Sequence, residues 1–391
     1  MLRSASPAAV ITGCGVVSPL GSGVDAFRDG LLLGAAAAAP IRRFPAHDLR
    51  PGHAAEVDET TEVDRAGVFA LRAATEALRA AELDASNVRR ARLGVTLGTT
   101  LGGMLIFEAW AEDPGGAVST ADLARIPYYA PAARLAGEIG AGGPVATTQL
   151  ACASGTHALG LAREWIVSGA ADVVLAGGTD HLCRFVVAGF NGLRATAEIA
   201  RPFDRDRTGL VLGEGAAVLV VESAAHAERR GAPVLARLLG AGVAGDGVHM
   251  TAPDREGAGA ERAIRAALDD AGVVPGDVGF VSAHGTATVF NDAMEARCLT
   301  RVFGAGGVPV NSIKGAIGHT LGAAGALEAV LCVDVVRSGM IPATAGLTHV
   351  DPSCANLDLV RGATRSSRVD IALSTSSGFA GANAAIVIGA P

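Results

Sequence analysis

Residues 144–155 read Pro-Val-Ala-Thr-Thr-Gln-Leu-Ala-Cys-Ala-Ser-Gly, an extended apolar run that passes into small residues. This pattern predicts a short strand, a tight turn around Cys152 and a helix that ends near Ser168-Gly169. Strand-like and helical runs alternate in the same way along the rest of the chain. The alternation predicts an α/β protein with a largely parallel sheet.

The strand–turn–helix unit recurs from Pro309-Val310, with His319 at the turn and a helix that ends near Ser338-Gly339. A similar pattern also precedes each copy of this unit. Residues 70–100 and residues 259–288 both predict a helix, a polar link, a strand and a Gly-Thr turn, in that order. The polar links contain Asp84, Asn87 and Asp277. Two matches in the same order favour duplication. We therefore expect two α/β halves, 1–232 and 233–391, that form a sandwich.

The composition excludes several classes of protein. The chain has 391 residues, of which 50% are hydrophobic and 18% charged, so a large folded core is expected. The net charge of −7 gives no general attraction to nucleic acid or to an anionic membrane. The longest apolar run, Gly30–Ile41, is too short to span a bilayer, and residues 8–13 resemble a first strand rather than a signal peptide. Six irregularly spaced cysteines indicate neither a disulfide framework nor a metal site, so a cytoplasmic protein is expected.

Cys152 differs from the other five cysteines because it lies where a predicted strand ends and a predicted helix begins. Unpaired N–H groups and the positive dipole end of a helix favour a thiolate and lower the pKa of a thiol. The small residues Ala151, Ala153 and Gly155 leave room for a substrate beside the sulfur. A nucleophile at such a turn is typical of acyl transfer, so we expect Cys152 to be catalytic.

Two histidines and one lysine are further candidates. His284 ends a predicted strand, and His319 precedes a predicted helix. Lys314, five residues before His319, is the only lysine of the chain beside 31 arginines. Lysine in so arginine-rich a sequence indicates a need for a compact ammonium group on a flexible stem, which arginine cannot replace.

Three segments together resemble the signatures of the elongating β-ketoacyl-acyl-carrier-protein synthases, which have a Cys-His-His site and belong to the thiolase superfamily. They are Ala-Cys-Ala-Ser-Gly at 151–155, His-Gly-Thr-Ala-Thr with Asn-Asp at 284–292, and Asn-Ser-Ile-Lys-Gly-Ala-Ile-Gly-His at 311–319. Further matches lie at 201–204, 213–216 and 377–383. The likeness follows the chain from the first strand to the last. It implies a thiolase-like α/β fold of two duplicated halves, in which central mixed sheets sandwich helices in αβαβα layers.

The resemblance also implies the reaction, a decarboxylative Claisen condensation of an acyl thioester with malonyl-acyl-carrier protein in fatty-acid or polyketide synthesis. Cys152 would accept the acyl group. His284 and His319 would stabilise the enolate that remains when malonyl-carrier loses CO₂. Lys314 would set the electrostatics of the site through a salt bridge with Glu328.

Other matching residues would bind the substrate and its carrier. The backbone N–H groups of Cys152 and Phe379 would form an oxyanion hole, and Arg194 would help to dock the acidic carrier protein. Contacts with the pantetheine arm and the acyl chain would come from Thr286, Thr288, Phe190 and Phe379. No resident cofactor is implied, because 4′-phosphopantetheine arrives on the carrier. A homodimer with residues 145–150 at its interface is expected, and neither nucleic acid nor a membrane is an expected partner.

The sequence departs from the family pattern at several positions. Ser377 stands where an aromatic residue is usual, which opens space near the site, and Ala380 stiffens a loop that Gly would allow to move. Val289 stands where Pro is common, and the link between residues 196 and 201 is short. Residues 56–64 include five acidic side chains where many relatives have basic ones, and an acidic surface there would repel an acidic carrier. These departures favour specialised over primary metabolism.

Two alternatives to a condensing enzyme stay open at this point. The chain could be a catalytically silent partner of another ketosynthase, like a chain-length factor, although such partners lack the nucleophile. It could also transfer acyl groups through Cys152 without condensing them. Release of CO₂ from malonyl-carrier separates these alternatives from a condensing enzyme. Dinucleotide binding is excluded, because no Gly-x-Gly-x-x-Gly follows a predicted strand with an acidic residue in register.

Overall fold

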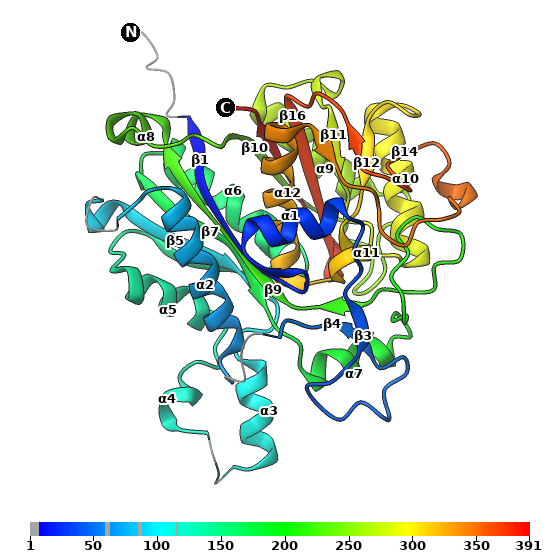
Figure 1. Ribbon diagram of the computed structural model, residues 1–391, viewed down its shortest axis with the longest axis horizontal. Helices are drawn as coiled ribbons and strands as arrows, with labels where there is room; N and C mark the ends of the chain where they lie inside the picture. The colour runs from blue at the N-terminus through cyan, green and yellow to red at the C-terminus, as the bar shows by residue number, and fades with distance from the viewer. Residues whose placement is uncertain (1–7, 59–62, 85–87, 115, 117) are drawn as a thin grey trace.

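The computed structural model describes residues 8–58, 63–84, 88–114, 116 and 118–391 (Figure 1). Asn87 of the predicted polar link and residues 59–62 of the acidic segment lie outside these ranges. In the described part of the N-terminal half, five strands lie side by side in the order β6-β5-β7-β9-β1. Their bounds are Val145–Thr148 for β6, Leu93–Gly98 for β5, Val173–Asp180 for β7, Gly215–Ser223 for β9 and Ala9–Ser18 for β1.

The C-terminal half continues the sheet with the same order reversed, β10-β17-β16-β11-β12, so that β10 corresponds to β1 and β12 to β6, and β14 is added beyond β12. The bounds are Ala236–Gly245, Ala382–Gly389, Ile371–Gly378, Phe280–Ser282, Pro309–Asn311 and Asp358–Leu359, respectively. Strands β1 and β10 pair antiparallel and join the two halves into one continuous sheet. The parallel pair β5–β6 corresponds to the parallel pair β11–β12. The repetition predicted from the sequence is therefore a repetition of topology.

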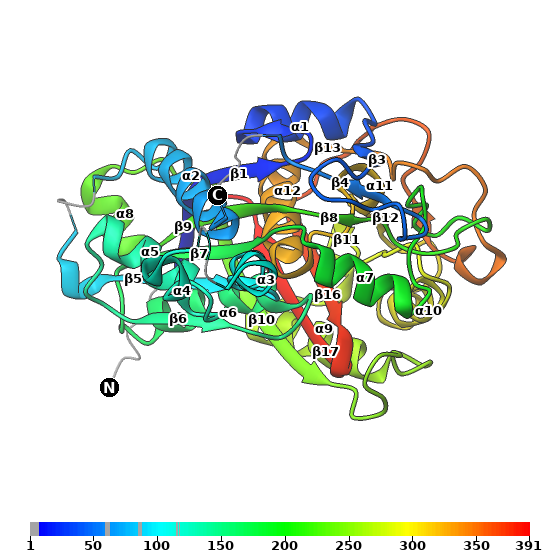
Figure 2. The ribbon, with the colours of Figure 1, turned by 90° about the horizontal axis from the view of Figure 1, so that it is seen from below.

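Helices form three layers around the sheet (Figures 1 and 2). Helices α6 (Ser154–Val167) and α12 (Ala324–Ser338) contact each other in the middle layer, against strands of both halves. Twelve of the fifteen residues of α12 are buried, as expected of a helix that is apolar on nearly all sides. The outer layers are α2 (Arg65–Ala80) with α5 (Ala130–Ile139), and α9 (Ala258–Ala271) with α10 (Val289–Phe303). This arrangement confirms the predicted thiolase-like layering.

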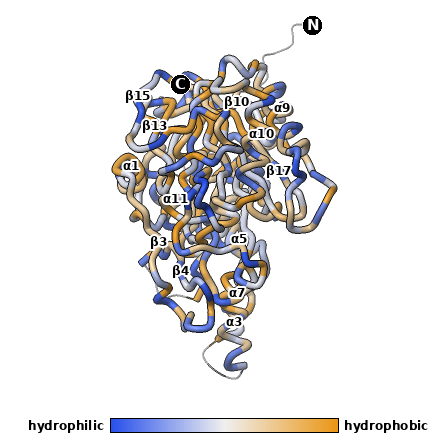
Figure 3. The backbone as a smooth tube through the Cα atoms, turned by 90° about the vertical axis from the view of Figure 1, so that its right-hand side faces the viewer, coloured by the Kyte–Doolittle hydropathy of each residue, from blue (hydrophilic) through white to orange (hydrophobic). Residues whose placement is uncertain are grey.

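Shorter elements connect these layers. Helices α3 (Met104–Glu112) and α4 (Thr120–Leu123) project from the body at the end opposite the N-terminus (Figures 1 and 3). Strand β11 begins at Phe280, shortly after a 3-10 turn of residues 275–277. The remaining bounds are Gly21–Ser22 (β2), Val24–Leu32 (α1), Ala38–Pro40 (β3), His53–Ala55 (β4), Arg184–Gly192 (α7), Leu212–Gly213 (β8), Ala224–Arg230 (α8), Lys314–Ile317 (α11), Met340–Ile341 (β13) and Arg365–Ser366 (β15).

Apolar and hydrophilic segments alternate along the chain (Figure 3), and the buried apolar side chains belong mainly to the strands and the central helices. Strands β1, β7 and β9 are buried along their whole length, which explains their Val-, Ala- and Gly-rich sequences. Among the described residues, no helix is both long enough and apolar enough to cross a membrane.

Candidate active site

The turn between β6 and α6 holds Cys152 in a fixed position. Ala151 has a φ of 47°, a left-handed conformation that costs free energy in a residue other than glycine. The Ser154 hydroxyl stabilises this turn, since it accepts a hydrogen bond from the Leu150 N–H at 2.8 Å and donates one to the Ala151 carbonyl at 2.6 Å. Cys152 is 6% exposed, and its sulfur lies at the N-terminal end of α6. The predicted strand–nucleophile–helix turn is thus present.

Small residues around Cys152 permit close packing of the backbone. A Cβ atom on Gly155 would lie 2.7 Å from the carbonyl oxygen of Gly322, so this glycine allows α6 to approach the segment before α12. A Cβ atom on Gly378 would lie 3.1 Å from the backbone nitrogen of Cys152. The expectation that Gly155 leaves room for a substrate is therefore wrong, because that space is filled by the chain itself.

His284 and His319 lie next to each other, as the sequence resemblance implied. Their ring centroids are 5.2 Å apart with an interplanar angle of 85°, and each side chain is 2% exposed. His284 follows the carboxyl end of β11, and His319 lies between α11 and the 3-10 turn Leu321–Ala323. Within the described residues, neither Nδ1 atom has a hydrogen-bond partner.

The protonation of these groups is set mainly by burial. Burial lowers the pKa of both histidines well below 6.5, and the charge of Lys314 lowers it further, so both imidazoles are neutral at neutral pH. Burial also raises the pKa of the Cys152 thiol to about 12, although Lys314 acts in the opposite direction. The prediction of a lowered pKa for Cys152 is wrong, because desolvation outweighs the favourable end of the helix. The resting group is a thiol that must lose its proton during the reaction.

Lys314 and Glu328 form the ion pair that the resemblance implied, at the start of α11 and inside α12. Burial raises the pKa of the Glu328 carboxyl, and the ammonium group of Lys314 lowers it. The second carboxylate oxygen accepts a hydrogen bond from Ser376 at 3.4 Å, and the Ser376 and Thr156 hydroxyls lie 2.7 Å apart. This network joins α6, α12 and β16 behind the cavity. Neither charged side chain of the pair lines the cavity itself.

Two buried carboxylates that the sequence reasoning missed hold this geometry. Glu295 of α10 accepts hydrogen bonds from the backbone N–H groups of His284, at 2.7 Å, and Gly285, at 2.8 Å. Asp180, at the end of β7, accepts four hydrogen bonds from the Thr99 hydroxyl and from the N–H groups of Thr100, Leu101 and Gly322. The available signal for Glu295 was an acidic residue at helical spacing from the apolar residues Cys298, Leu299 and Val302.

A cavity of about 330 Å³ opens beside the reactive groups. It is lined by Cys152, His284 and His319 and by the expected substrate contacts Thr286, Thr288, Phe190 and Phe379. The Thr286 and Thr288 hydroxyls are 2.9 Å apart, and the Phe190 and Phe379 rings stack with centroids 5.3 Å apart. Arg194 lies exposed in the lining, near the opening. The structure thus brings eight of the ten expected site residues to one cavity and places Lys314 and Glu328 behind it.

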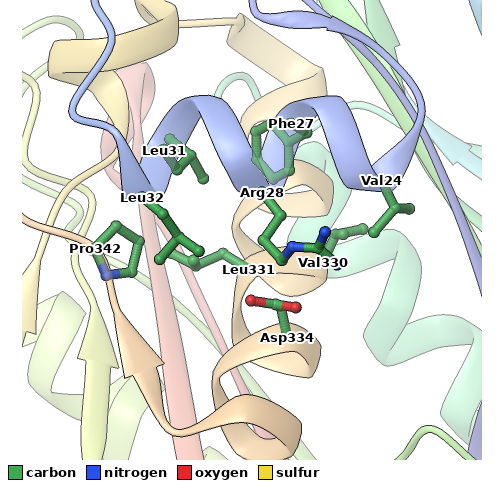
Figure 4. Close-up of a pocket in the computed structure, with 9 residues that line it drawn as sticks. All are labelled: Val24, Phe27, Arg28, Leu31, Leu32, Val330, Leu331, Asp334 and Pro342. Carbon is green, nitrogen blue, oxygen red and sulfur yellow. The ribbon is translucent and has the colours of Figure 1, made fainter. Parts of the chain in front are cut away.

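A second hollow, between α1 and α12, is much smaller (Figure 4). Its volume of about 10 Å³ is lined by apolar side chains such as Phe27, Leu31 and Val330, with Arg28 and Asp334 at one side. That volume holds about one water molecule. It is a packing gap rather than a binding site.

Three positions that depart from the family pattern, Ser377, Ala380 and Val289, lie at or beside the cavity. Ser377 lines it and donates a hydrogen bond to Asn383 at 2.8 Å. Ala380 has a φ of 61°, and its N–H donates to the carbonyl of Met250 at 2.7 Å. Val289, the first residue of α10, is 53% exposed and also lines the cavity.

The acidic segment 56–64 does not present a row of free carboxylates. Glu56 and Asp58 both pair with Arg42, and Asp64 caps α2 and pairs with Arg134. Glu59 and Glu62 lie outside the described residues. Arginines thus compensate part of the charge of the three described carboxylates, and the expected repulsion of an acidic carrier stays a prediction.

Comparison with known families agrees with this site. Family models for the β-ketoacyl synthase N-terminal and C-terminal domains match residues 7–227 and 235–348. The chain belongs to the β-ketoacyl synthase family, and it is a condensing enzyme of the thiolase superfamily.

Individual relatives cover the whole chain. A tetracenomycin polyketide synthase ketoacyl synthase alpha subunit from Streptomyces glaucescens is 38% identical over 426 residues, which cover 100% of this chain and 99% of that protein. A 3-oxoacyl-[acyl-carrier-protein] synthase 2 from Coxiella burnetii is 36% identical and covers 97% of both chains. The solved structure of the ishigamide ketosynthase/chain length factor is similar with a TM-score of 0.93 and 36% identity, and covers 99% of this chain and 100% of that one.

Proposed function

We propose that Cys152 takes an acyl group from a carrier thioester and that His284 and His319 then drive its condensation with malonyl-carrier. The supporting observation is that one thiol and two neutral imidazoles line the same cavity. A silent partner of another ketosynthase does not need this combination. The relatives do not distinguish fatty-acid from polyketide synthesis, because they include members of both kinds.

In the first step, the Cys152 sulfur attacks the thioester carbonyl of the acyl-carrier. Because burial keeps the thiol protonated, a neutral imidazole of the cavity accepts its proton as the new C–S bond forms. The N–H groups of Cys152 and Phe379 bind the oxyanion of the tetrahedral intermediate. The carrier thiol leaves with a proton, and the acyl group stays on the protein.

In the second step, malonyl-carrier loses CO₂. The electrons of the broken C–C bond move to the thioester oxygen, where negative charge develops. Neutral His284 and His319 each donate one N–H to that oxygen, and nearby Lys314 adds positive potential without touching the substrate. The enolate carbon then attacks the acyl carbonyl, the C–S bond breaks, and the released Cys152 thiolate takes up one proton from solvent water.

The remaining lining residues position the substrate. Thr286 and Thr288 lie where they would hydrogen-bond the pantetheine arm, and the stacked rings of Phe190 and Phe379 would bound the acyl chain. Arg194 would meet the acidic carrier at the opening. The proposed reaction needs no resident cofactor, since 4′-phosphopantetheine arrives on the carrier protein.

Strand β6 has a free edge at the border of the sheet, in the part of the chain that the structure describes. It is the last strand of its half-sheet in the described part of the chain, so one edge carries unpaired backbone groups, and its Val145 is 45% exposed. Tyr129, which precedes the neighbouring helix α5, is 63% exposed. We propose a dimer through this edge, with a second copy of the chain as partner. A cytoplasmic location stays a prediction.

Intact-mass spectrometry of the protein mixed with acyl-carrier, followed by addition of malonyl-carrier, tests the proposed function. Wild-type protein should gain one acyl group and then lose it as a β-ketoacyl-carrier product appears, whereas Cys152→Ala should gain none. Acylation without later product would instead indicate a non-condensing acyltransferase. No acylation with any carrier, together with co-purification of a second synthase, would indicate a silent partner.

A further inference from the structure

The backbone of His319 is hydrogen-bonded on both sides to one short strand, β8. The His319 N–H donates to the carbonyl of Val211 at 2.7 Å, and the His319 carbonyl accepts from the N–H of Gly213 at 2.9 Å. His319 thus pairs in parallel with Leu212 of β8, whose other edge pairs with β4 (Figure 2). These two hydrogen bonds fix the point from which the histidine side chain extends.

Two glycines allow the backbones to lie this close together. A Cβ atom on Gly213 would lie 2.3 Å from the carbonyl oxygen of Ile317. A Cβ atom on Gly318 would lie 2.9 Å from the carbonyl oxygen of Leu212. The contact between β8 and the segment that ends at His319 therefore leaves no slack, so a shift of β8 moves the histidine.

The orientation of the His319 ring depends on this backbone contact. A catalytic histidine is commonly oriented by a hydrogen bond to the ring nitrogen that does not face the substrate. Within the ranges that the structure describes, Nδ1 of His319 has no hydrogen-bond partner. The position of the backbone and the packing around the buried ring therefore have to supply the orientation.

Strand β8 runs directly into Glu214, whose carboxylate is fully buried. One carboxylate oxygen accepts from the Val57 N–H at 2.9 Å, and the other accepts from the Leu182 N–H at 3.0 Å. Arg65 of α2 donates to both oxygens, from Nε at 2.8 Å and from Nη2 at 2.6 Å. Glu214 thereby ties the end of β8 to α2 and to the segments that hold residues 57 and 182.

Stability alone does not explain this buried ion pair. The side chains of Arg65 and Glu214 are both 0% exposed, and two charges removed from water contribute little net stability compared with well-packed apolar side chains. A guanidinium group that meets a carboxylate through two directed hydrogen bonds does provide a fixed geometry. The element that this geometry fixes is the end of β8.

We propose that Glu214, held by Arg65, is a positioning residue for His319: the ion pair fixes β8, and β8 fixes the backbone of the histidine. This inference rests on the proposed function, because it assumes that the His319 imidazole donates to the enolate oxygen. Neither Glu214 nor Arg65 lines the catalytic cavity, so their effect on the reaction passes through the backbone. A displacement of about 1 Å at a reacting group can slow a reaction about a hundredfold.

The test measures CO₂ release from malonyl-carrier in protein that carries Cys152→Ala, where acylation does not interfere. A further Glu214→Gln substitution should lower kcat about tenfold to a hundredfold, because the loss of the ion pair with Arg65 lets β8 shift. In Cys152→Ala/His319→Ala the same substitution should have no further effect, because no imidazole is left to position. In Cys152→Ala/His284→Ala it should keep its effect, which shows that the low rate of a histidine variant does not hide it.

Glu222→Gln is the matched control. Glu222 lies at the opposite end of β9 from Glu214, is also fully buried and also pairs with an arginine, Arg230. This substitution should destabilise the protein in urea titrations without a change in CO₂ release. The double variant Glu214→Gln/Arg65→Met removes both buried charges, so it should recover stability but not CO₂ release, and it keeps the test open if the single variant folds poorly.

Three outcomes would contradict the positioning role while the condensing function stands. They are an unchanged kcat in Glu214→Gln and in the double variant, an equal loss with and without the His319 imidazole, and an equal loss in Glu222→Gln, which would indicate a general structural defect. CO₂ release that does not depend on His319 at all would overturn the proposed function, and the positioning role with it.

Discussion

Lys314 and Glu328 form an ion pair with side chains only 2% and 1% exposed, directly behind the cavity that holds the reactive groups. Two charges so deeply buried are tolerated only because each compensates the other. The same ammonium group lowers the pKa of His284 and of His319 and opposes the raised pKa of Cys152. One lysine therefore acts on all three reacting groups without lining the cavity, which explains why this arginine-rich chain retains it.

Removal of the lysine charge should destabilise the fold. Lys314→Met leaves Glu328 buried and unpaired, which should lower the free energy of unfolding by about 3–5 kcal/mol in urea titrations. The double variant Lys314→Met/Glu328→Gln should recover most of that loss, because no uncompensated charge remains. Equal stabilities of the single and double variants would show that the pair contributes nothing as a pair.

The buried histidines make stability depend on pH. Their pKa is lowered in the folded state, so below about 6.5 the unfolded chain binds protons that the folded chain does not. The free energy of unfolding should therefore fall with decreasing pH by up to about 1.4 kcal/mol per pH unit for each histidine. Urea titrations between pH 8 and pH 5.5 measure this slope, and His284→Asn/His319→Asn should reduce it without abolishing it, because burial also lowers the pKa of His181 to about 4. A slope that the double variant leaves unchanged would assign the pH dependence to other groups.

Glu295 should act through His284. In Glu295→Gln the backbone N–H groups of His284 and Gly285 both lose their charged acceptor, and one of them faces an amide NH₂ group that cannot accept, a change of about 1.5–3 kcal/mol per hydrogen bond. CO₂ release from malonyl-carrier should slow about tenfold to a hundredfold, while acylation of Cys152 changes less. Single-turnover assays separate the two steps. Equal losses in both steps would indicate a general structural defect instead of positioning of His284.

Close packing of α6 against the segment before α12 depends on the absence of a side chain at Gly155. Gly155→Ala would place a methyl group 2.7 Å from the Gly322 carbonyl oxygen and should lower the free energy of unfolding by about 1–3 kcal/mol. Gly137→Ala on α5 is the matched control, since a Cβ atom there meets nothing within 4 Å. That control should be stabilised by about 0.5–1 kcal/mol. Urea titrations of both variants measure these changes. An unchanged free energy of unfolding in Gly155→Ala would contradict the close packing of α6 against the segment before α12.

Local patterns predicted much of the fold and of the site. The recurrent Pro-Val strands at 144 and 309 became β6 and β12, which hold equivalent places in the two half-sheets. The turn at Cys152 was predictable because its motif carries its own strand end and helix start, whereas the neighbouring position of His284 and His319 was implied only by the family resemblance.

Features that depend on distant segments were not predictable. The raised pKa of Cys152 reflects burial by elements far along the chain, which a local helix-dipole argument cannot include. Gly155 faces Gly322, and Asp180 accepts from residues 99–101, so neither partner is visible in a local pattern.

The most direct test of the central claim is CO₂ release from malonyl-carrier by protein that cannot be acylated. With Cys152→Ala, release should continue without condensation, and a further His284→Ala or His319→Ala substitution should reduce it by about two orders of magnitude, the effect of losing one preorganised donor to a developing oxyanion. Release that persists undiminished when both histidines are replaced would contradict the assignment of the pair as the enolate-stabilising groups.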